Sequence, residues 1–131
     1  MPDQFRYDYA VIRVVPKVER EEFINAGVIL SCPERSFLEA QIKLNESRLL
    51  ALDPSLDLEM VKTHLATIPK ICRGGADAGP IGQLSQRERF YWLAAPRSTI
   101  IQTSPVHTGR CSDPAAALRH LVATMVETED K

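Results

Sequence analysis

The stretch Tyr7–Val15, YDYAVIRVV, decides the fold of this chain, because its apolar side chains fall on both faces of an extended strand. The two sets are Tyr7, Tyr9, Val11 and Val15 on one face, and Ala10, Ile12 and Val14 on the other. A strand that is apolar on both faces usually lies in the interior of its sheet. Pro16 has no N–H to donate to a neighbouring strand, so we expect the strand to end there.

Two more strands are predicted directly after this one. The first is Phe23–Cys32, FINAGVILSC, which should place Ile24, Ala26, Val28 and Leu30 on one face. Gly27 within it predicts a bulge or a close approach by another backbone. The turn Pro33–Ser36 then leads to a strand over Phe37–Ile42. We expect the three strands to form an antiparallel meander.

From Asn45 onward the apolar spacing becomes that of helices. The predicted helices run from Asn45 to Leu52, from Ser55 or Asp57 to Pro69, from the capping box Ser85-x-x-Glu88 to about Leu93, and from Asp113-Pro114 to about Val126. Pro69 should kink or end its helix, because proline removes a backbone hydrogen bond. The stripe of this second helix contains His64, which we expect in the core or at its boundary.

The region after the third helix is less regular. A fourth strand is predicted over Ser98–Ser104, whereas the aromatic residues of Phe90–Leu93 suit a helix or a strand. In either form we expect Phe90, Trp92 and Leu93 to pack against the sheet. The predicted fold is a single α+β domain over residues 1–131. Its antiparallel sheet has about four strands, the N-terminal meander plus the strand near 98–104, with helices covering one face.

Composition excludes several classes of function. The chain has 131 residues, of which 44% are hydrophobic, enough for one ordinary core. Sixteen basic and 17 acidic residues give a net charge of −1, which disfavours broad binding to nucleic acid or to an anionic membrane. The sequence shows neither a signal peptide nor an apolar run long enough to span a bilayer. Its three separated cysteines suit reduced thiols, so we expect a cytoplasmic protein.

The candidate ligand or partner site is the polar segment Arg97–Gly109, together with two residues of the N-terminal hairpin. Arginine and hydroxyl groups both stabilise negative charge, and His107 on a turn is suited to acid–base chemistry. The candidate residues are Arg13, Asn25, Arg97, Ser98, Thr99, Gln102, Ser104, His107 and Thr108. A structural role is the alternative for each: Arg13 could pair with a carboxylate, and the hydroxyls could bond the backbone of edge strands and turns.

No complete catalytic, cofactor or metal motif accompanies this segment. The sequence has neither a G-x-S-x-G nor a phosphate-binding loop, and the glycine-rich segment 73–82 is predicted to be a surface loop. His107 and Cys111 would supply two metal ligands, whereas zinc takes three or four. We therefore expect no cofactor and no metal, and the sequence leaves open whether the protein is an enzyme.

Four local sequence patterns occur in order along the chain. They are Tyr7-Asp8-Tyr9 with Arg13 and Pro16, Arg20-Glu21-Glu22-Phe23-x-Asn25-x-Gly27-Val28, Arg89-Phe90-x-Trp92-Leu93-x-Ala95-Pro96-Arg97-Ser98-Thr99, and Ser104-Pro105-Val106-His107-Thr108-Gly109 with Asp113-Pro114. In these the chain resembles the bacterial domain-of-unknown-function family numbered 3037, from about Tyr7 to Val126. The resemblance implies a small bacterial cytoplasmic protein and suggests a HipA-like kinase protein as a partner. It implies no catalytic residue.

Two functions remain open from the sequence. The favoured one is a non-catalytic interaction or regulatory domain, because no catalytic motif is complete and the charge is balanced. The alternative is a small enzyme or ligand-binding domain for a phosphorylated or otherwise anionic molecule, with Arg13 and Arg97 as anchors and His107 as acid or base.

Overall fold

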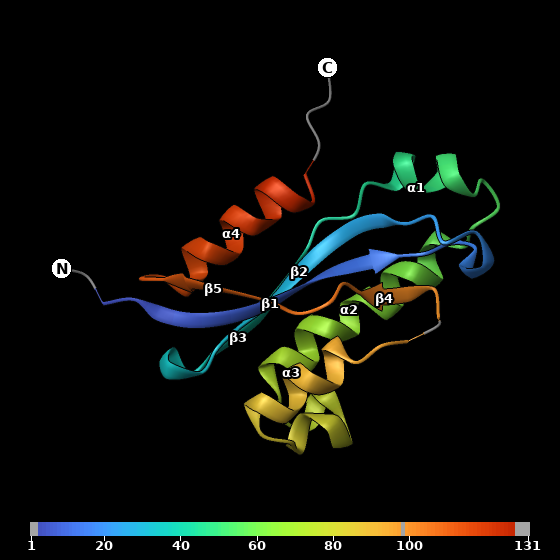
Figure 1. The fold of residues 1–131 in the computed structure, drawn as a ribbon. Helices are drawn as coiled ribbons and strands as arrows, with labels where there is room; N and C mark the ends of the chain where they lie inside the picture. Colours follow the sequence, from blue (N-terminus) through green and yellow to red (C-terminus); the bar gives the residue numbers. More distant parts are fainter. Residues whose placement is uncertain (1–2, 98, 128–131) are drawn as a thin grey trace.

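The computed structural model describes residues 3–97 and 99–127 and has a five-stranded antiparallel sheet at its centre (Figure 1). Its strands are β1 (Phe5–Val14), β2 (Ile24–Cys32), β3 (Phe37–Ile42), β4 (Ile101–Thr103) and β5 (His107–Cys111). The order is β3-β2-β1-β4, and β5 pairs with β1 beyond the end of β4. The predicted meander and the α+β class are therefore confirmed, and β1 is interior, as its two apolar faces indicate.

A bulge in β2 changes the predicted faces of that strand. Ile12 lies opposite Gly27 and Arg13 lies opposite Asn25, so that Ala26 is an extra residue without its own partner on β1. One extra residue reverses the direction of every side chain beyond it. Ile24 and Ala26 consequently pack in one core cluster, whereas Val28 and Leu30 pack in the other. The prediction that all four share a face was wrong.

Gly27 lies close to the backbone of the neighbouring strand β3, as a glycine within a strand predicted. A Cβ atom on this residue would lie 2.5 Å from the carbonyl oxygen of Gln41 on β3. It would also lie 3.2 Å from the side chain of Ile12. The position therefore has no room for a side chain.

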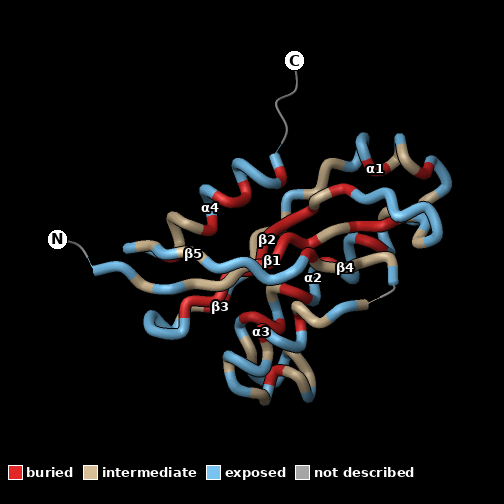
Figure 2. The backbone as a smooth tube through the Cα atoms, viewed as in Figure 1, coloured by how far each residue is buried: buried red, intermediate tan, exposed pale blue. Residues whose placement is uncertain are grey.

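Helices cover both faces of the sheet rather than one (Figures 1 and 2). The helices are α1 (Glu46–Leu52), α2 (Leu58–Arg73), α3 (Gln86–Ala94) and α4 (Pro114–Met125). Residues of α2 and α3 pack with Ile12 and Val14, whereas residues of α4 pack with Val28 and Leu30. The second layer follows from the two apolar faces of β1, each of which must be removed from water.

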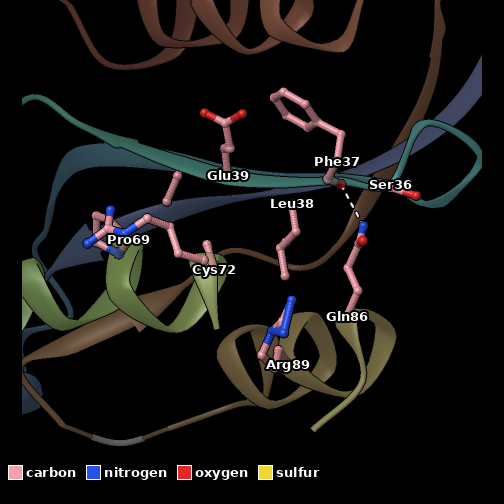
Figure 3. A pocket seen from close by; sticks show the side chains of 10 residues that line it. Ser36, Phe37, Leu38, Glu39, Pro69, Cys72, Gln86 and Arg89 are labelled. Atoms are coloured by element: carbon pink, nitrogen blue, oxygen red, sulfur yellow. Dashed lines mark hydrogen bonds between the residues drawn. The ribbon is translucent and has the colours of Figure 1, made fainter. Parts of the chain in front are cut away.

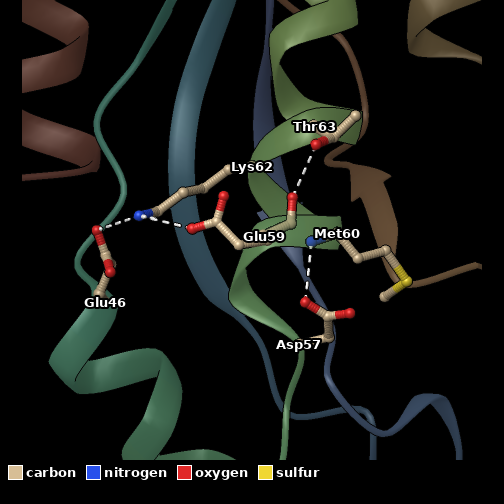
Figure 4. Close-up of polar contacts among 6 residues, drawn as sticks. All are labelled: Glu46, Asp57, Glu59, Met60, Lys62 and Thr63. Atoms are coloured by element: carbon tan, nitrogen blue, oxygen red, sulfur yellow. Dashed lines mark hydrogen bonds and ion pairs between the residues drawn. The ribbon is translucent and has the colours of Figure 1, made fainter.

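The predicted caps begin the helices. The side chains of Asn45, Asp57 and Asp113 accept from backbone N–H groups of α1, α2 and α4, and Ser85 with Glu88 forms the complete capping box of α3. At the start of α2, Lys62 also bonds Glu46 at 3.0 Å and so joins α2 to α1 (Figure 4). Short 3-10 turns lie at Val18–Arg20, Pro33–Arg35, Ala76–Ala78 and Pro80–Gln83.

Three further predictions differ from the structure. Of the two outcomes predicted for Pro69, a kink or a helix end, the helix end is wrong: α2 continues to Arg73, and its apolar stripe goes on to bury Ile71 and Cys72. Phe90–Leu93 is helical, and Trp92 is exposed although Phe90 and Leu93 are buried as expected. The fourth strand is shorter than Ser98–Ser104, and β5 was not predicted, since HTGRC lacks an apolar alternation.

Candidate functional site

The guanidinium of Arg97 caps the C-terminal end of α3. It donates hydrogen bonds to the carbonyl oxygens of Trp92 at 2.6 Å, Leu93 at 2.9 Å and Ala95 at 3.2 Å. It also stacks on the Trp92 ring, 4.6 Å from the ring centre. These carbonyls are among those that a helix end leaves without partners, and a cation there is favoured by the helix dipole. Most of the donor capacity of Arg97 is thus used within the protein.

Arg13 lies in a row of polar side chains across the sheet. Its neighbours are Asn25 on β2 and Gln102 on β4. The Arg13 guanidinium stacks on Phe23 at 4.2 Å, and the Asn25 amide donates to the carbonyl oxygen of Met125 at 2.9 Å. Arg13 Nε and Asn25 Oδ1 are buried atoms without a hydrogen-bond partner, one a donor and the other an acceptor.

Arg13 does not form an ion pair with the carboxylate of Glu22. The carboxylate of Glu22 bonds Arg20 instead. Within the described residues, no carboxylate lies within the 4.0 Å ion-pair distance of Arg13. The structural alternative for Arg13 was an ion pair with a carboxylate. The guanidinium instead contacts the Phe23 ring.

Ser104 joins β4 to β5 and is buried. Its N–H donates to Val11 O at 2.8 Å, and its hydroxyl oxygen accepts from Val11 N at 2.8 Å. The hydroxyl thus takes the place of a strand carbonyl where Pro105 interrupts the ladder. These bonds support the structural alternative for Ser104.

We expect Ser104→Ala to lower the free energy of unfolding by about 1–3 kcal/mol, because the buried N–H of Val11 would lose its partner. Chemical denaturation measures the difference. Thr108→Ala is the matched control, since it removes only an exposed bond to Asp8 and should cost about 0.5 kcal/mol or less. Equal effects of the two substitutions would contradict the structural role of Ser104.

His107 and Thr108 lie on β5 rather than on the predicted turn, because this segment pairs with Phe5–Tyr9. The exposed His107 ring stacks on Tyr9 with ring centres 5.4 Å apart, and Thr108 donates to Asp8 at 2.7 Å. Neither residue lines the cavity that contains Arg97. The structure therefore separates His107 from Arg97, and Ser98 lies outside the described residues.

Thr99 and Gln102 are the predicted candidates that do share a cavity with Arg97. This cavity has a volume of about 260 Å³ and lies between α2, α3 and β4. A second cavity of about 440 Å³ adjoins it along α2 and shares His64, Thr99 and Ile101 with it. We call the two together the α2–β4 groove. Its lining is Val18, Met60, Val61, His64, Thr67, Ile68, Ile71, Trp92, Leu93, Arg97, Thr99, Ile100, Ile101, Gln102 and Thr103.

Most residues of this groove were not predicted as site residues, and three of them are used below. Met60 projects from the first turn of α2, on the side away from Lys62 (Figure 4), and 38% of it is exposed. Trp92 lies at the other end and is 41% exposed. His64 between them is exposed, not in the core or at its boundary. The sequence did contain one sign of this groove, because the apolar stripe of α2 is wider than packing against one face of the sheet requires.

The three cysteines are free thiols. Burial raises the pKa of Cys72 to about 12, and Arg89 lowers it by less than burial raises it. Burial also raises the pKa of Cys111, which lies beside the thiol of Cys32 and is raised further by it. Since thiolates are the nucleophilic form, both environments disfavour cysteine catalysis at neutral pH.

Within the described residues, no three side chains among His, Cys, Asp and Glu gather where they could hold a metal ion. None of the helices in that same part of the chain combines the length and apolar character that a membrane span requires.

Comparison with known proteins gives a family but no further relative. Neither the curated proteins nor the solved structures contain a significant match. The family model described as "Protein of unknown function (DUF3037)" matches residues 9–126, which include part of β1, all of β2 to β5, and α1 to α4. A match over most of the chain, with its central sheet and its helices on both faces, shows that this protein belongs to the DUF3037 family.

Proposed function

We propose that this protein is a non-catalytic interaction domain, which binds a partner protein through the α2–β4 groove. The observation that carries the proposal is the exposure of Met60 and Trp92 at the two ends of one apolar groove. Tryptophan and methionine are enriched in protein interfaces, and large apolar side chains gain most when a partner covers them. The groove thus offers two anchors for one partner segment.

The charges of the groove suggest the chemistry of that segment. Arg97 and His64 line the groove, and no aspartate or glutamate is among its described lining residues. Arg97 is in no ion pair within the described part of the chain. A complementary partner segment therefore carries apolar side chains for Met60 and Trp92 and an acidic side chain near Arg97. The positive charge of Arg97 attracts that side chain although most of its donors bond carbonyl oxygens of α3. The family resemblance makes a HipA-like kinase protein the first partner to test.

The same contacts favour binding over catalysis. The donors of Arg97 bond α3 carbonyls, and His107 lies on β5 outside the groove. The alternative, an enzyme or ligand-binding domain that uses Arg13, Arg97 and His107 together, would need these three groups at one ligand. Their separation in the fold weakens it.

Site-specific photo-crosslinking in the native host tests this proposal. A photoreactive amino acid at Thr67, which lines the groove, should crosslink to one protein partner. The matched control is Ala66, the exposed neighbour on α2 that is not part of the groove lining. A crosslink at both positions, or only at Ala66, would contradict the proposal. A crosslinked product that contains two copies of this chain would show that the groove mediates self-association and does not bind a different protein.

A further inference from the structure

A further cavity, separate from the α2–β4 groove, lies on the opposite side of α2. It has a volume of about 470 Å³ and lies between the edge strand β3, the end of α2 and the start of α3 (Figure 3). Volumes in this range are typical of small-molecule sites. The lining residues used below are Leu38, Glu39, Cys72, Arg73, Gln86 and Arg89.

Two guanidinium groups line this cavity without a carboxylate partner. Arg73 is the last residue of α2, and Arg89 lies one turn inside α3. Within residues 3–97 and 99–127, neither of them forms an ion pair. Guanidinium groups are the side chains best suited to bind carboxylate and phosphate, because their donors form a planar fork. Neither guanidinium group of the cavity is therefore neutralised by a direct ion pair within the described residues.

Arg89 is also held with an unsatisfied donor. Its Nη1 donates to Leu84 O at 3.3 Å, and its Nε is buried without a hydrogen-bond partner. The other such buried atoms among the described residues, Arg13 Nε and Asn25 Oδ1, are a donor and an acceptor on opposed strand positions. In the described part of the chain no unpartnered buried acceptor corresponds to Arg89 Nε, although a buried donor normally has a partner.

Gly74 helps to hold Arg89 in this position. It ends α2 with a φ of 75°, and a Cβ atom there would lie 2.5 Å from Nη1 of Arg89. The glycine thus allows the guanidinium to lie directly against the end of α2. Arg73 precedes Gly74 in the chain, so this contact also keeps the two arginines at the same cavity.

The remaining lining residues suit an anion. Gln86 donates through Nε2 to Phe37 O at 2.7 Å, which fixes its amide at the cavity wall. Glu39 lines the cavity, but its carboxylate points to the opposite face of β3, away from Arg89 (Figure 3). Leu38 and Cys72 provide an apolar floor, and the protonated Cys72 thiol adds no negative charge. The site is therefore built for binding and lacks a nucleophile.

We propose that this cavity binds an oxyanion, the phosphate or carboxylate group of a small molecule, through Arg73 and Arg89. The two guanidinium groups hold the charged group, and the cavity holds the part of the molecule attached to it. This binding is independent of the partner that we propose for the α2–β4 groove.

Isothermal titration calorimetry at constant ionic strength tests the site with two probes, inorganic phosphate and succinate. We expect at least one of them to bind the full chain saturably, and the comparison distinguishes a phosphate from a carboxylate ligand. Arg73→Gln and Arg89→Gln should each weaken that binding about tenfold or more, as expected for loss of a charge-assisted hydrogen bond.

Arg87→Gln is the matched control on the same helix. Arg87 stacks on Tyr91 and does not line the cavity, so its loss should change the affinity about twofold or less by long-range charge alone. Arg73 is exposed, which makes Arg73→Gln informative even if Arg89→Gln unfolds the protein. The proposal is wrong if neither probe binds saturably, or if Arg87→Gln weakens binding as much as Arg73→Gln does.

Discussion

Substitution of Gly27 by valine should unfold the protein or leave it without a cooperative thermal transition. The Cβ atom alone would lie 2.5 Å from Gln41 O, a backbone atom of the neighbouring strand that cannot rotate away. Overpacking of a core costs about 1–3 kcal/mol even where side chains can adjust. Here β2 would have to separate from β3 beside the bulge at Ala26. We expect Gly27→Ala to lower the free energy of unfolding by about 3 kcal/mol, the upper end of that range, and Gly27→Val to lower it further, as measured by urea denaturation.

Gly75→Ala separates this steric effect from backbone strain. Gly75 has a φ of 88°, which disfavours any L side chain, but a Cβ atom there would have no neighbour within 4 Å. The expected cost of that strain is about 1–2 kcal/mol. Gly27 is not in the left-handed region, so a side chain there would clash with Gln41 O but would not strain the backbone of Gly27 itself. If Gly27→Ala costs no more than Gly75→Ala, the close approach of β2 and β3 is not as described.

The central sheet could be predicted because β1 carries its signal in consecutive residues. The alternation within Tyr7–Val15 gives both the strand and its interior position, since apolar side chains on both faces have to be covered. The face of each β2 residue could not be predicted, because Gly27 indicates a bulge without showing which residue is extra. Strand β5 is defined by pairing with β1 instead of by its own composition, and pairing is not visible in HTGRC.

The candidate site was harder to predict because its residue types do not show which contacts the side chains make in the fold. The sequence shows that Arg97 is followed by hydroxyl residues, but not that carbonyls of α3 will accept its hydrogen bonds. Ser104 resembles a site residue in sequence and is a buried substitute for a strand carbonyl in the fold. Met60 and Trp92 are 32 positions apart (92 − 60) and become one groove only when β4 lies beside α2.

Removal of the two groove anchors should have the largest effect on function. In a Met60→Ala/Trp92→Ala variant, a partner segment would lose both exposed apolar contacts, and Arg97 would lose the ring on which it stacks. One anchor of this kind contributes about 2 kcal/mol or more to binding, which corresponds to a factor of about 30 in the dissociation constant. Because losses at neighbouring anchors are not additive, we expect the constant of the double variant to rise at least about 30-fold. The fold should persist, because Phe90 and Leu93 make the buried contacts of α3.

Tyr91→Ala provides the control for the loss of an exposed aromatic residue. Tyr91 precedes Trp92 on α3 and is 51% exposed, yet it does not line the groove. Its removal should leave partner affinity within about twofold of the wild-type value, as expected for a surface residue outside an interface. Thermal melting of all three proteins establishes that each remains folded.

The most direct test of the α2–β4 groove is therefore the affinity of the partner crosslinked through Thr67, measured by calorimetry for the wild type, Met60→Ala/Trp92→Ala and Tyr91→Ala. We predict that binding is lost or weakened at least about 30-fold in the double variant alone. Equal affinity of the folded double variant and the wild type would contradict the assignment of this groove as the docking surface.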